Sequence, residues 1–267
     1  MCKIFIYYHP QKKELSKKNL AKQNNNPLLE KVLLHELQIE SSQNLTILYT
    51  PKGKPYLKDY PSLHFNLSNT ASYTAIAIDT TPIGIDIEKV QERPYESLLK
   101  RWFTQKESQF VLNHPVSCRL FRFILLWTYK ESLLKNIGCG IGAEMKEHEI
   151  LFRQANSIRD TSSISKENQE VFALYKNIEH NFFSKIITSQ QVLKTSPLSA
   201  LNELENLNKL GEIDEFCRVD ELYKANKLKG VESLLEKELF ILSLCYTNKE
   251  STSPKYPQFF FPKEIPL

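Results

Sequence analysis

The sequence predicts an α+β fold, on three observations. Strand patterns come both before and after the helical patterns, without the strict alternation that a parallel α/β sheet requires. The 267 residues are enough for one large domain or two small ones. A content of 41% apolar residues with a net charge of only +4 excludes a disordered chain.

The first third of the chain carries most of the strand patterns. They are, in chain order, 3–8, 45–49, 63–68, 73–78 and 83–88. The tight connection over 79–82 predicts that the last two strands form a hairpin. A helix over 27–38 is predicted to begin at Pro27, because proline suits the first helical turn. The polar segment 11–26 is predicted to be a loop, and 52–55 a turn.

A helical region follows the strands. Pro94 opens it, and residues 104–107 have the spacing of a capping box, so a second helix is expected to start at Thr104. The strongest helix pattern covers 119–137 and ends at Gly138, a common helix stop. The capping box by itself explains the acidic residue at its fourth position.

The pattern is weaker beyond the helical region. Residues 144–170 are polar, 171–194 have room for two strands, and 197–240 contain helical stretches. Residues 239–246 predict a buried closing strand, and the tail from Ser251 is expected to be loose.

The charge of the chain is uneven. Residues 1–60 hold ten lysines against five acidic residues, and the remainder is nearly neutral. A basic end suits a phosphate-rich ligand or an acidic protein, although a solvated surface explains it equally well. Nucleic acid is not expected as a partner, because the lysines lack interleaved arginines and stacking aromatic residues.

Composition also bears on location. No stretch approaches the ~18 apolar residues of a membrane span, and the first ten residues lack a secretory signal. The five cysteines have no metal-ligand spacing. We therefore expect a cytoplasmic protein with free thiols and no membrane partner.

Two carboxylates stand out in the segment Gly84-Ile85-Asp86-Ile87-Glu88. Positions 86 and 88 of a strand point to one face, about 7 Å apart, while the isoleucines point to the other. Like charges this close repel unless water or a cation separates them, and the hard cation Mg²⁺ suits carboxylates. A plain amphipathic strand with a solvated acidic face is the alternative.

A third carboxylate occupies an unexpected helix position. On the helix over 119–137, Glu131 falls within the apolar stripe that contains Ile124 and Trp127. A buried carboxylate is costly unless it is paired or binds a metal. A helix pair with Lys135, one turn on, would explain a surface position but not this one.

Asp86, Glu88 and Glu131 could together supply three oxygen ligands to one Mg²⁺ ion. Such ions usually bridge to substrate phosphates, which points to phosphoryl-type transfer. After the strand over 63–68, the small polar side chains of residues 68–70 could hold a phosphate or form an ordinary turn.

Four motifs occur in order: Gly-Lys-Pro at 53–55, Phe-Asn-Leu-Ser at 65–68, Gly-Ile-Asp-Ile-Glu at 84–88, and Trp-x-x-Lys-Glu-Ser-x-x-Lys at 127–135. Their order and spacing over 27–142 resemble the 4′-phosphopantetheinyl transferases, in the broad-specificity type that serves peptide and polyketide synthetases. The resemblance implies two pseudo-symmetric lobes, each a small antiparallel sheet with a long helix, and an active site between them. The lobes would be 1–82 and 83–267, with a possible insertion within 144–235.

The resemblance implies an activity and a metal site. Members of the family move 4′-phosphopantetheine from coenzyme A to a serine of an acyl or peptidyl carrier protein, releasing adenosine 3′,5′-bisphosphate. Asp86, Glu88 and Glu131 match the Mg²⁺ ligands, and Glu131 is also a candidate base for the serine proton. Lys135 matches a lysine near the pyrophosphate, where a fixed cation favours the transition state.

Other implied contacts with coenzyme A are less regular. Lys54 matches a lysine near the 3′-phosphate, Lys130 a further basic position, and Ser68 with Asn69 the turn beside the phosphates. The family usually has histidine where this chain has Asn69, which predicts weaker coenzyme A binding. The usual arginine-containing segment is also replaced by lysines within 11–26.

These departures leave two functions open. The first is an active transferase, expected to work as a monomer. The alternative is a protein that binds coenzyme A or a carrier protein with weak or no catalysis.

Overall fold

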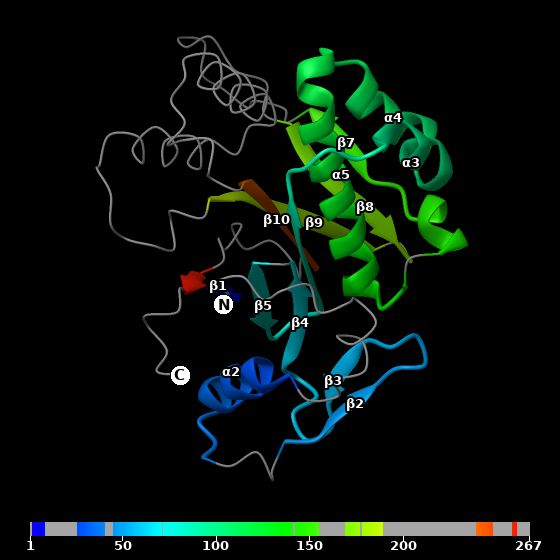
Figure 1. Cartoon of the computed structure of the whole chain (residues 1–267). Coiled ribbons are helices and arrows are strands. Elements are labelled where there is room, and N and C mark those ends of the chain that lie inside the picture. Colours follow the sequence, from blue (N-terminus) through cyan, green and yellow to red (C-terminus); the bar gives the residue numbers. More distant parts are fainter. Residues whose placement is uncertain are drawn as a thin grey trace, which may run out of the picture.

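The computed structural model describes residues 2–8, 26–40, 45–70, 72–140, 142–154, 169–176, 178–188, 239–247 and 258–260. Within these ranges the chain forms four layers: a helix, two sheets packed face to face, and a second layer of helices (Figure 1). Most of the loop predicted over 11–26 and nearly all of the helical stretches predicted over 197–240 lie outside the described residues.

The first sheet has the strand order β11-β1-β5-β4. Its strands are β1 (Lys3–Tyr8), β4 (His64–Asn69), β5 (Tyr73–Asp79) and β11 (Gln258–Phe260). The neighbours β1, β5 and β4 run antiparallel, whereas β11 runs parallel to β1. A short piece of the tail that was expected to be loose therefore pairs with the first strand of the chain.

The second sheet has the strand order β6-β10-β9-β8-β7, and all its neighbours are antiparallel. Its strands are β6 (Ile83–Lys89), β7 (Leu151–Gln154), β8 (Gln169–Tyr175), β9 (Ile178–Thr188) and β10 (Leu239–Thr247). The two strands predicted within 171–194 and the closing strand are confirmed.

The hairpin predicted between the strands over 73–78 and 83–88 is wrong. Both edges of β5 are already paired, one with β1 and the other with β4. No edge is left for β6, which crosses to the second sheet and pairs with β10 instead.

A separate two-stranded hairpin joins β2 (Ile47–Tyr49) to β3 (Pro55–Leu57). The turn between them, predicted over 52–55, contains Gly53 at a φ of +88°, a conformation that favours glycine. The strand β3 was not predicted.

Three helix ends lie where the sequence predicts them, whereas the longest helix begins at Val116, three residues before its predicted start at 119. Asn26 caps α2 (Pro27–Leu37) by accepting from two backbone N–H groups, with Pro27 in the first turn. The remaining helices are α3 (Tyr95–Trp102), α4 (Gln105–Leu112), α5 (Val116–Ile137) and the 3₁₀ helix η2 (Ala143–Glu147). The capping box at Thr104 is present in α4, and α5 ends at Gly138, whose φ is +74°.

Strand alternation explains the four layers. In β1, Ile4 and Ile6 lie between the two sheets, while Phe5 and Tyr7 pack against α2. In β6, the isoleucines 83, 85 and 87 also lie between the sheets. The intervening residues of β6 consequently face α5, which covers the opposite face of the second sheet (Figure 1).

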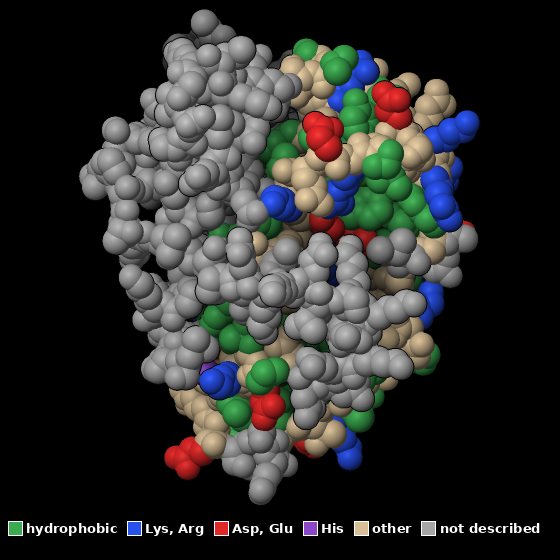
Figure 2. Space-filling view, in the orientation of Figure 1, with side chains coloured by type: hydrophobic (Ala, Val, Ile, Leu, Met, Phe, Trp, Pro, Cys, Tyr) green, Lys and Arg blue, Asp and Glu red, His purple; other side chains and the backbone are tan. Residues whose placement is uncertain are grey.

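The outer surface near α3 and α4 carries mixed charge. Lysine and arginine side chains lie among aspartate and glutamate side chains over the upper part of the face shown in Figure 2. Such a mixture is typical of a solvated surface, whereas nucleic-acid-binding surfaces carry a field of positive charge. Among the residues that the structure describes, no helix combines the length and the apolar character that crossing a bilayer requires.

Candidate functional site

The site begins with the close approach of β6 to α5 at Gly84. A Cβ atom at Gly84 would lie 2.0 Å from the carbonyl oxygen of Ser132 and 2.5 Å from the amide nitrogen of Asn136. Only glycine fits at this point, since real Cβ atoms do not approach backbone atoms so closely. This contact brings the next residue on the same strand face, Asp86, up to the side chains of α5.

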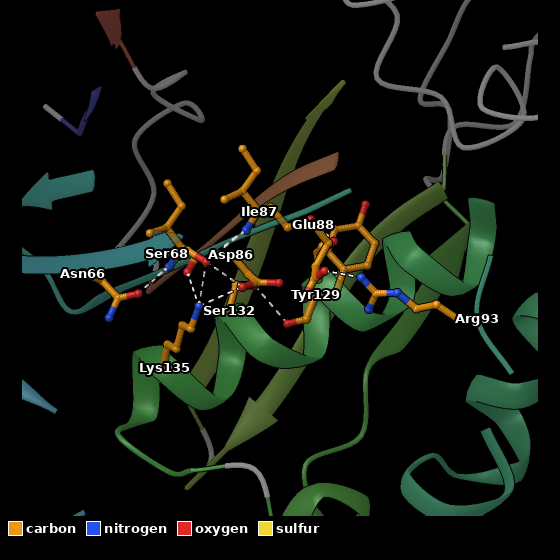
Figure 3. Close-up of polar contacts among 12 residues, drawn as sticks. Asn66, Ser68, Asp86, Ile87, Glu88, Arg93, Tyr129, Ser132 and Lys135 are labelled. Carbon is orange, nitrogen blue, oxygen red and sulfur yellow. Dashed lines mark hydrogen bonds and ion pairs between the residues drawn. The ribbon is translucent and has the colours of Figure 1, made fainter. Parts of the chain in front are cut away.

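Asp86 is held by a serine and a lysine. Its Oδ1 atom accepts from the Ser68 hydroxyl at 2.9 Å and from Lys135 Nζ at 2.7 Å (Figure 3). Its Oδ2 atom is buried and has no hydrogen-bond partner among the residues that the structure describes. Only 4% of Asp86 is exposed, so the solvated acidic face that was the alternative does not apply to it.

Side chains of β4 bind the outer edge of β6. The Asn66 side-chain oxygen accepts from the Ile85 N–H at 2.9 Å, and the Ser68 hydroxyl accepts from the Ile87 N–H at 3.3 Å. The other edge of β6 pairs with β10. Asn66 and Ser68 thus replace a neighbouring strand where the two sheets meet, and they satisfy N–H groups that burial would otherwise leave unpaired.

The Ser68 hydroxyl is a structural group in this arrangement. Ser68 is 6% exposed, and besides Asp86 and the Ile87 N–H its hydroxyl contacts Lys135 Nζ at 3.0 Å. In these contacts the hydroxyl positions Asp86 and Lys135, and its role beside the phosphates of coenzyme A stays a prediction.

Glu88 lies two residues further along the same face and pairs with an arginine. Arg93, in the loop between β6 and α3, donates to Glu88 Oε2 (Figure 3). Burial and the nearby Asp86 carboxylate raise the pKa of Glu88, and the charges of Arg93 and Lys135 oppose that rise.

Glu131 completes a group of three carboxylates. It is 8% exposed on α5, as its place in the apolar stripe predicts. Burial first and the Asp86 carboxylate second raise the pKa of Glu131 to about 7, with a further contribution from Glu88 and an opposing one from Lys135. The three carboxylates are therefore near enough to repel one another.

The three carboxylates provide the type of ligand atom that a hard cation prefers. They offer only oxygen donors, and the unpartnered Oδ2 of buried Asp86 is a lone-pair site that a cation would satisfy. In the arrangement described, Asp86 and Glu88 are instead bound by Lys135 and Arg93. No group of three His, Cys, Asp or Glu side chains within the described ranges is gathered closely enough to hold an ion as it stands.

Lys54 reaches the end of α5 from the turn between β2 and β3. Its Nζ atom donates to the carbonyl oxygen of Asn136, one of the carbonyl groups at the carboxyl end of the helix. Burial lowers the pKa of Lys54 to about 8. Lys54 therefore lies near the α5 turn that carries Lys135.

Asn69 ends β4 at the surface. It is exposed, and its side-chain oxygen accepts from the Thr74 hydroxyl at 2.6 Å. Thr70 accepts from the backbone N–H groups of Ser72 and Tyr73. The end of this strand is thus a polar turn. Asn69 is exposed there, and its side chain carries an amide N–H donor.

The structure places Lys130 in the core beside Glu107, and its contact with coenzyme A stays a prediction. Lys130 is fully buried, donates to Glu107 and to the His148 carbonyl oxygen, and lies over the Phe103 ring. Its side chain has no exposed surface in this arrangement. Adjacent helix positions are 100° apart, which lets Lys130 point into the core while Glu131 points to β6.

Glu107 does more than its capping box requires. Besides accepting from the Thr104 N–H, it binds Lys130 and accepts from the Ile150 N–H at 2.7 Å. From the sequence, capping alone was the expected role of this residue. Its complete burial is the feature that helix pattern and capping could not reveal.

Two further site residues were missed from the sequence. Arg93 lies in a loop, where no periodicity indicates the direction of a side chain. Asn66 had a usable signal, because it precedes Ser68 by two residues on one strand face. Two polar side chains on one face of an otherwise buried strand could have indicated that both bind the same neighbouring segment.

Residues 82–190 match the model of the 4′-phosphopantetheinyl transferase superfamily. Three relatives illustrate the similarity. The 4′-phosphopantetheinyl transferase psf-1 of Bacillus pumilus is 33% identical over 110 residues, which cover 41% of this chain and 46% of that protein. The 4′-phosphopantetheinyl transferase Sfp of Bacillus subtilis is 27% identical over 162 residues, covering 58% and 71%. The L-aminoadipate-semialdehyde dehydrogenase-phosphopantetheinyl transferase of Xenopus laevis is 33% identical over 136 residues, covering 46% and 44%. The chain thus spans about half the length of most of the curated relatives it matches.

Proposed function

We propose that this chain, which matches the 4′-phosphopantetheinyl transferase superfamily over residues 82–190 and is similar to curated transferases of that kind, transfers 4′-phosphopantetheine from coenzyme A to a serine of an acyl or peptidyl carrier protein. Adenosine 3′,5′-bisphosphate is the other product. The observation that carries the proposal is the contact of β6 with α5 at Gly84. It gathers Asp86, Glu88 and Glu131 within the segment that matches the family.

The carboxylates have two roles in this proposal. Asp86, Glu88 and Glu131 would hold Mg²⁺, which supplies positive charge against the pyrophosphate of coenzyme A and the charge that grows on the leaving phosphate. An ionised carboxylate beside the metal can also accept a proton from a hydroxyl, directly or through a water molecule. We therefore assign Glu131 as the base that takes the proton of the carrier serine.

Lys135 and Lys54 supply fixed positive charge. Lys135 is held by Ser68, the Ile85 carbonyl oxygen and Asp86, so it requires little reorganisation to stabilise a developing phosphate charge. Lys54, with a pKa of about 8, stays mostly protonated at neutral pH and is proposed to contact the 3′-phosphate. Asn69 is proposed to donate its exposed amide to a coenzyme A phosphate in place of the family's histidine.

We also propose how the layers correspond to the family's architecture. The first sheet with α2 would form one pseudo-symmetric lobe and the second sheet with α5 the other, with the boundary near residue 82. The substrate site would lie where Ser68 of β4 meets β6 and α5. A monomer in the cytoplasm is proposed, and the free thiols of the described cysteines agree with a reducing compartment.

Intact-protein mass spectrometry of apo carrier proteins tests the proposal. One acyl carrier protein and one peptidyl carrier domain are incubated with this protein, coenzyme A and Mg²⁺, with EDTA as the control. A metal-dependent mass gain of one phosphopantetheine on the carrier serine supports the proposal. Binding of coenzyme A without any mass gain on either carrier would contradict it and favour the binding-protein alternative.

A further inference from the structure

Two cations of the chain itself occupy the carboxylates of β6. Lys135 binds Asp86 Oδ1 at 2.7 Å, and Arg93 binds Glu88 Oε2. Figure 3 shows the two cations on opposite sides, with the carboxylates between them. Most of the negative charge that would attract a divalent cation is thereby balanced within the protein.

The two cations are held in different ways. Lys135 comes from a helix, and its Nζ atom also contacts the Ser68 hydroxyl and the Ile85 carbonyl oxygen. Arg93 comes from the loop over 90–94, and the polar contact described for its guanidinium is the one with Glu88. Displacing Arg93 therefore breaks one ion pair, whose side chains are 19% and 27% exposed, whereas displacing Lys135 breaks a network of contacts.

We propose that Arg93 is an internal counter-ion that competes with a divalent cation for Glu88 and so weakens the binding of that cation. The inference rests on the metal site of the proposed function. The positive charge of the guanidinium neutralises part of the carboxylate charge that would attract a metal ion, and two cations near one carboxylate repel each other. Arg93 is thus a positioning residue that keeps Glu88 paired until the competing cation arrives.

Binding of Mn²⁺ to the full chain, measured by electron paramagnetic resonance of the free ion, tests this without any catalytic readout. Arg93→Gln is expected to bind Mn²⁺ roughly fivefold or more tightly than the unchanged protein, because one repelling charge is removed. Arg93→Lys, which retains the charge, should stay near the unchanged protein.

The matched control is Arg101→Gln. Arg101 is exposed and lies over the Trp102 ring on α3, so its removal changes the net charge equally without touching the carboxylates. Thermal unfolding in EDTA checks that each variant is folded. Equal or weaker Mn²⁺ binding by folded Arg93→Gln, or the same gain in Arg101→Gln, would overturn the inference, as would the absence of Mn²⁺ binding in every variant.

The outcome is separable from that of the proposed function, because the measurement contains neither coenzyme A nor a carrier protein. Tighter Mn²⁺ binding by Arg93→Gln without phosphopantetheine transfer by the unchanged protein would overturn the function and leave this inference standing. If the unchanged protein transfers phosphopantetheine but Arg93→Gln does not alter the Mn²⁺ affinity, the inference is overturned and the proposed function stands.

Discussion

Glu131 is the residue whose surroundings say most about chemistry. It lies buried on a helix beside Asp86, with Glu88 close enough to add to the repulsion. Burying a charged carboxylate in this way destabilises the folded protein. An ion pair with Lys135 does not offset the loss fully, since Lys135 is bound to Asp86. A residue placed against stability in this way is typical of a functional site.

Glu131→Gln is expected to lower the rate of transfer at least about 100-fold, because the amide can neither accept the serine proton nor carry a charge. The same change should leave the protein at least as stable at pH 8, since it removes a repelling charge. Rates come from the mass-spectrometric assay and stabilities from urea unfolding. Glu147→Gln, at an exposed position of η2, is the control that should alter neither. Normal turnover by Glu131→Gln would rule out the assigned role.

Lys54 gives a pH dependence of stability with a definite sign. Burial lowers its pKa from 10.5 to about 8 in the folded protein, so between these values the unfolded chain binds more protons. The free energy of unfolding of the unchanged protein, minus that of Lys54→Met, is therefore expected to rise from pH 8 to pH 10.5. Below pH 8 this difference should be constant. Urea unfolding of both proteins across this range measures the difference, in which other titrations cancel. A difference that falls with pH would contradict the buried position of Lys54.

At the scale of elements, the pairing of β6 with α5 depends on one missing side chain. Gly84→Ala is expected to destabilise the protein by about 3 kcal/mol, because the added Cβ would meet backbone atoms of Ser132 and Asn136 that cannot turn aside. Gly140→Ala is the matched control, since nothing lies within 4 Å of a Cβ at that position. Urea unfolding measures both changes. A Gly84→Ala protein as stable as the control would mean that the helix and the strand are further apart than described.

The contacts of α5 with α4 depend on the fully buried pair of Lys130 and Glu107. Lys130→Met should cost roughly 3–5 kcal/mol, because it leaves the Glu107 carboxylate buried without its cation. Adding Glu107→Gln removes that uncompensated charge, so the double variant should recover part of the loss. Urea unfolding of the single and double variants measures the coupling. Strictly additive losses would show that the pair does not act as a unit.

At the scale of the whole molecule, the two sheets share one apolar core. Side chains of β1 and β5 pack directly against those of β6 and β10, and Asn66 and Ser68 join the sheets at their edge. Two sheets that bury each other in this way should unfold together, whether or not each corresponds to a lobe.

Coincident unfolding transitions are therefore expected from two probes. Both tryptophans, Trp102 and Trp127, lie on the helical layer over the second sheet, so their fluorescence reports that half of the molecule. Far-ultraviolet circular dichroism reports all the secondary structure. Urea curves from the two probes should superimpose. Separate midpoints would show that the halves are independent, and that the shared core contributes little.

Local sequence patterns were enough to predict the features that depend on neighbouring residues. Pro27 at the start of α2, the capping box of α4 and Gly138 after α5 fix helix ends through local backbone geometry, and these three ends were predicted correctly. Alternation placed Asp86 on one face of its strand, and helical periodicity placed Glu131 on a buried stripe. Both patterns persist in the structure because they follow from backbone geometry.

Which of these elements pair or pack against one another becomes visible only in the tertiary structure. The partner of β6 depended on both edges of β5 being filled, and the last described strand, β11, came from more than 250 residues away to pair with β1. Lys130 and Glu131 are neighbours in sequence, yet one is bound in the core and the other faces the carboxylates of β6. Such outcomes depend on the competition of distant segments for the same edge or the same buried charge, which a local pattern does not contain.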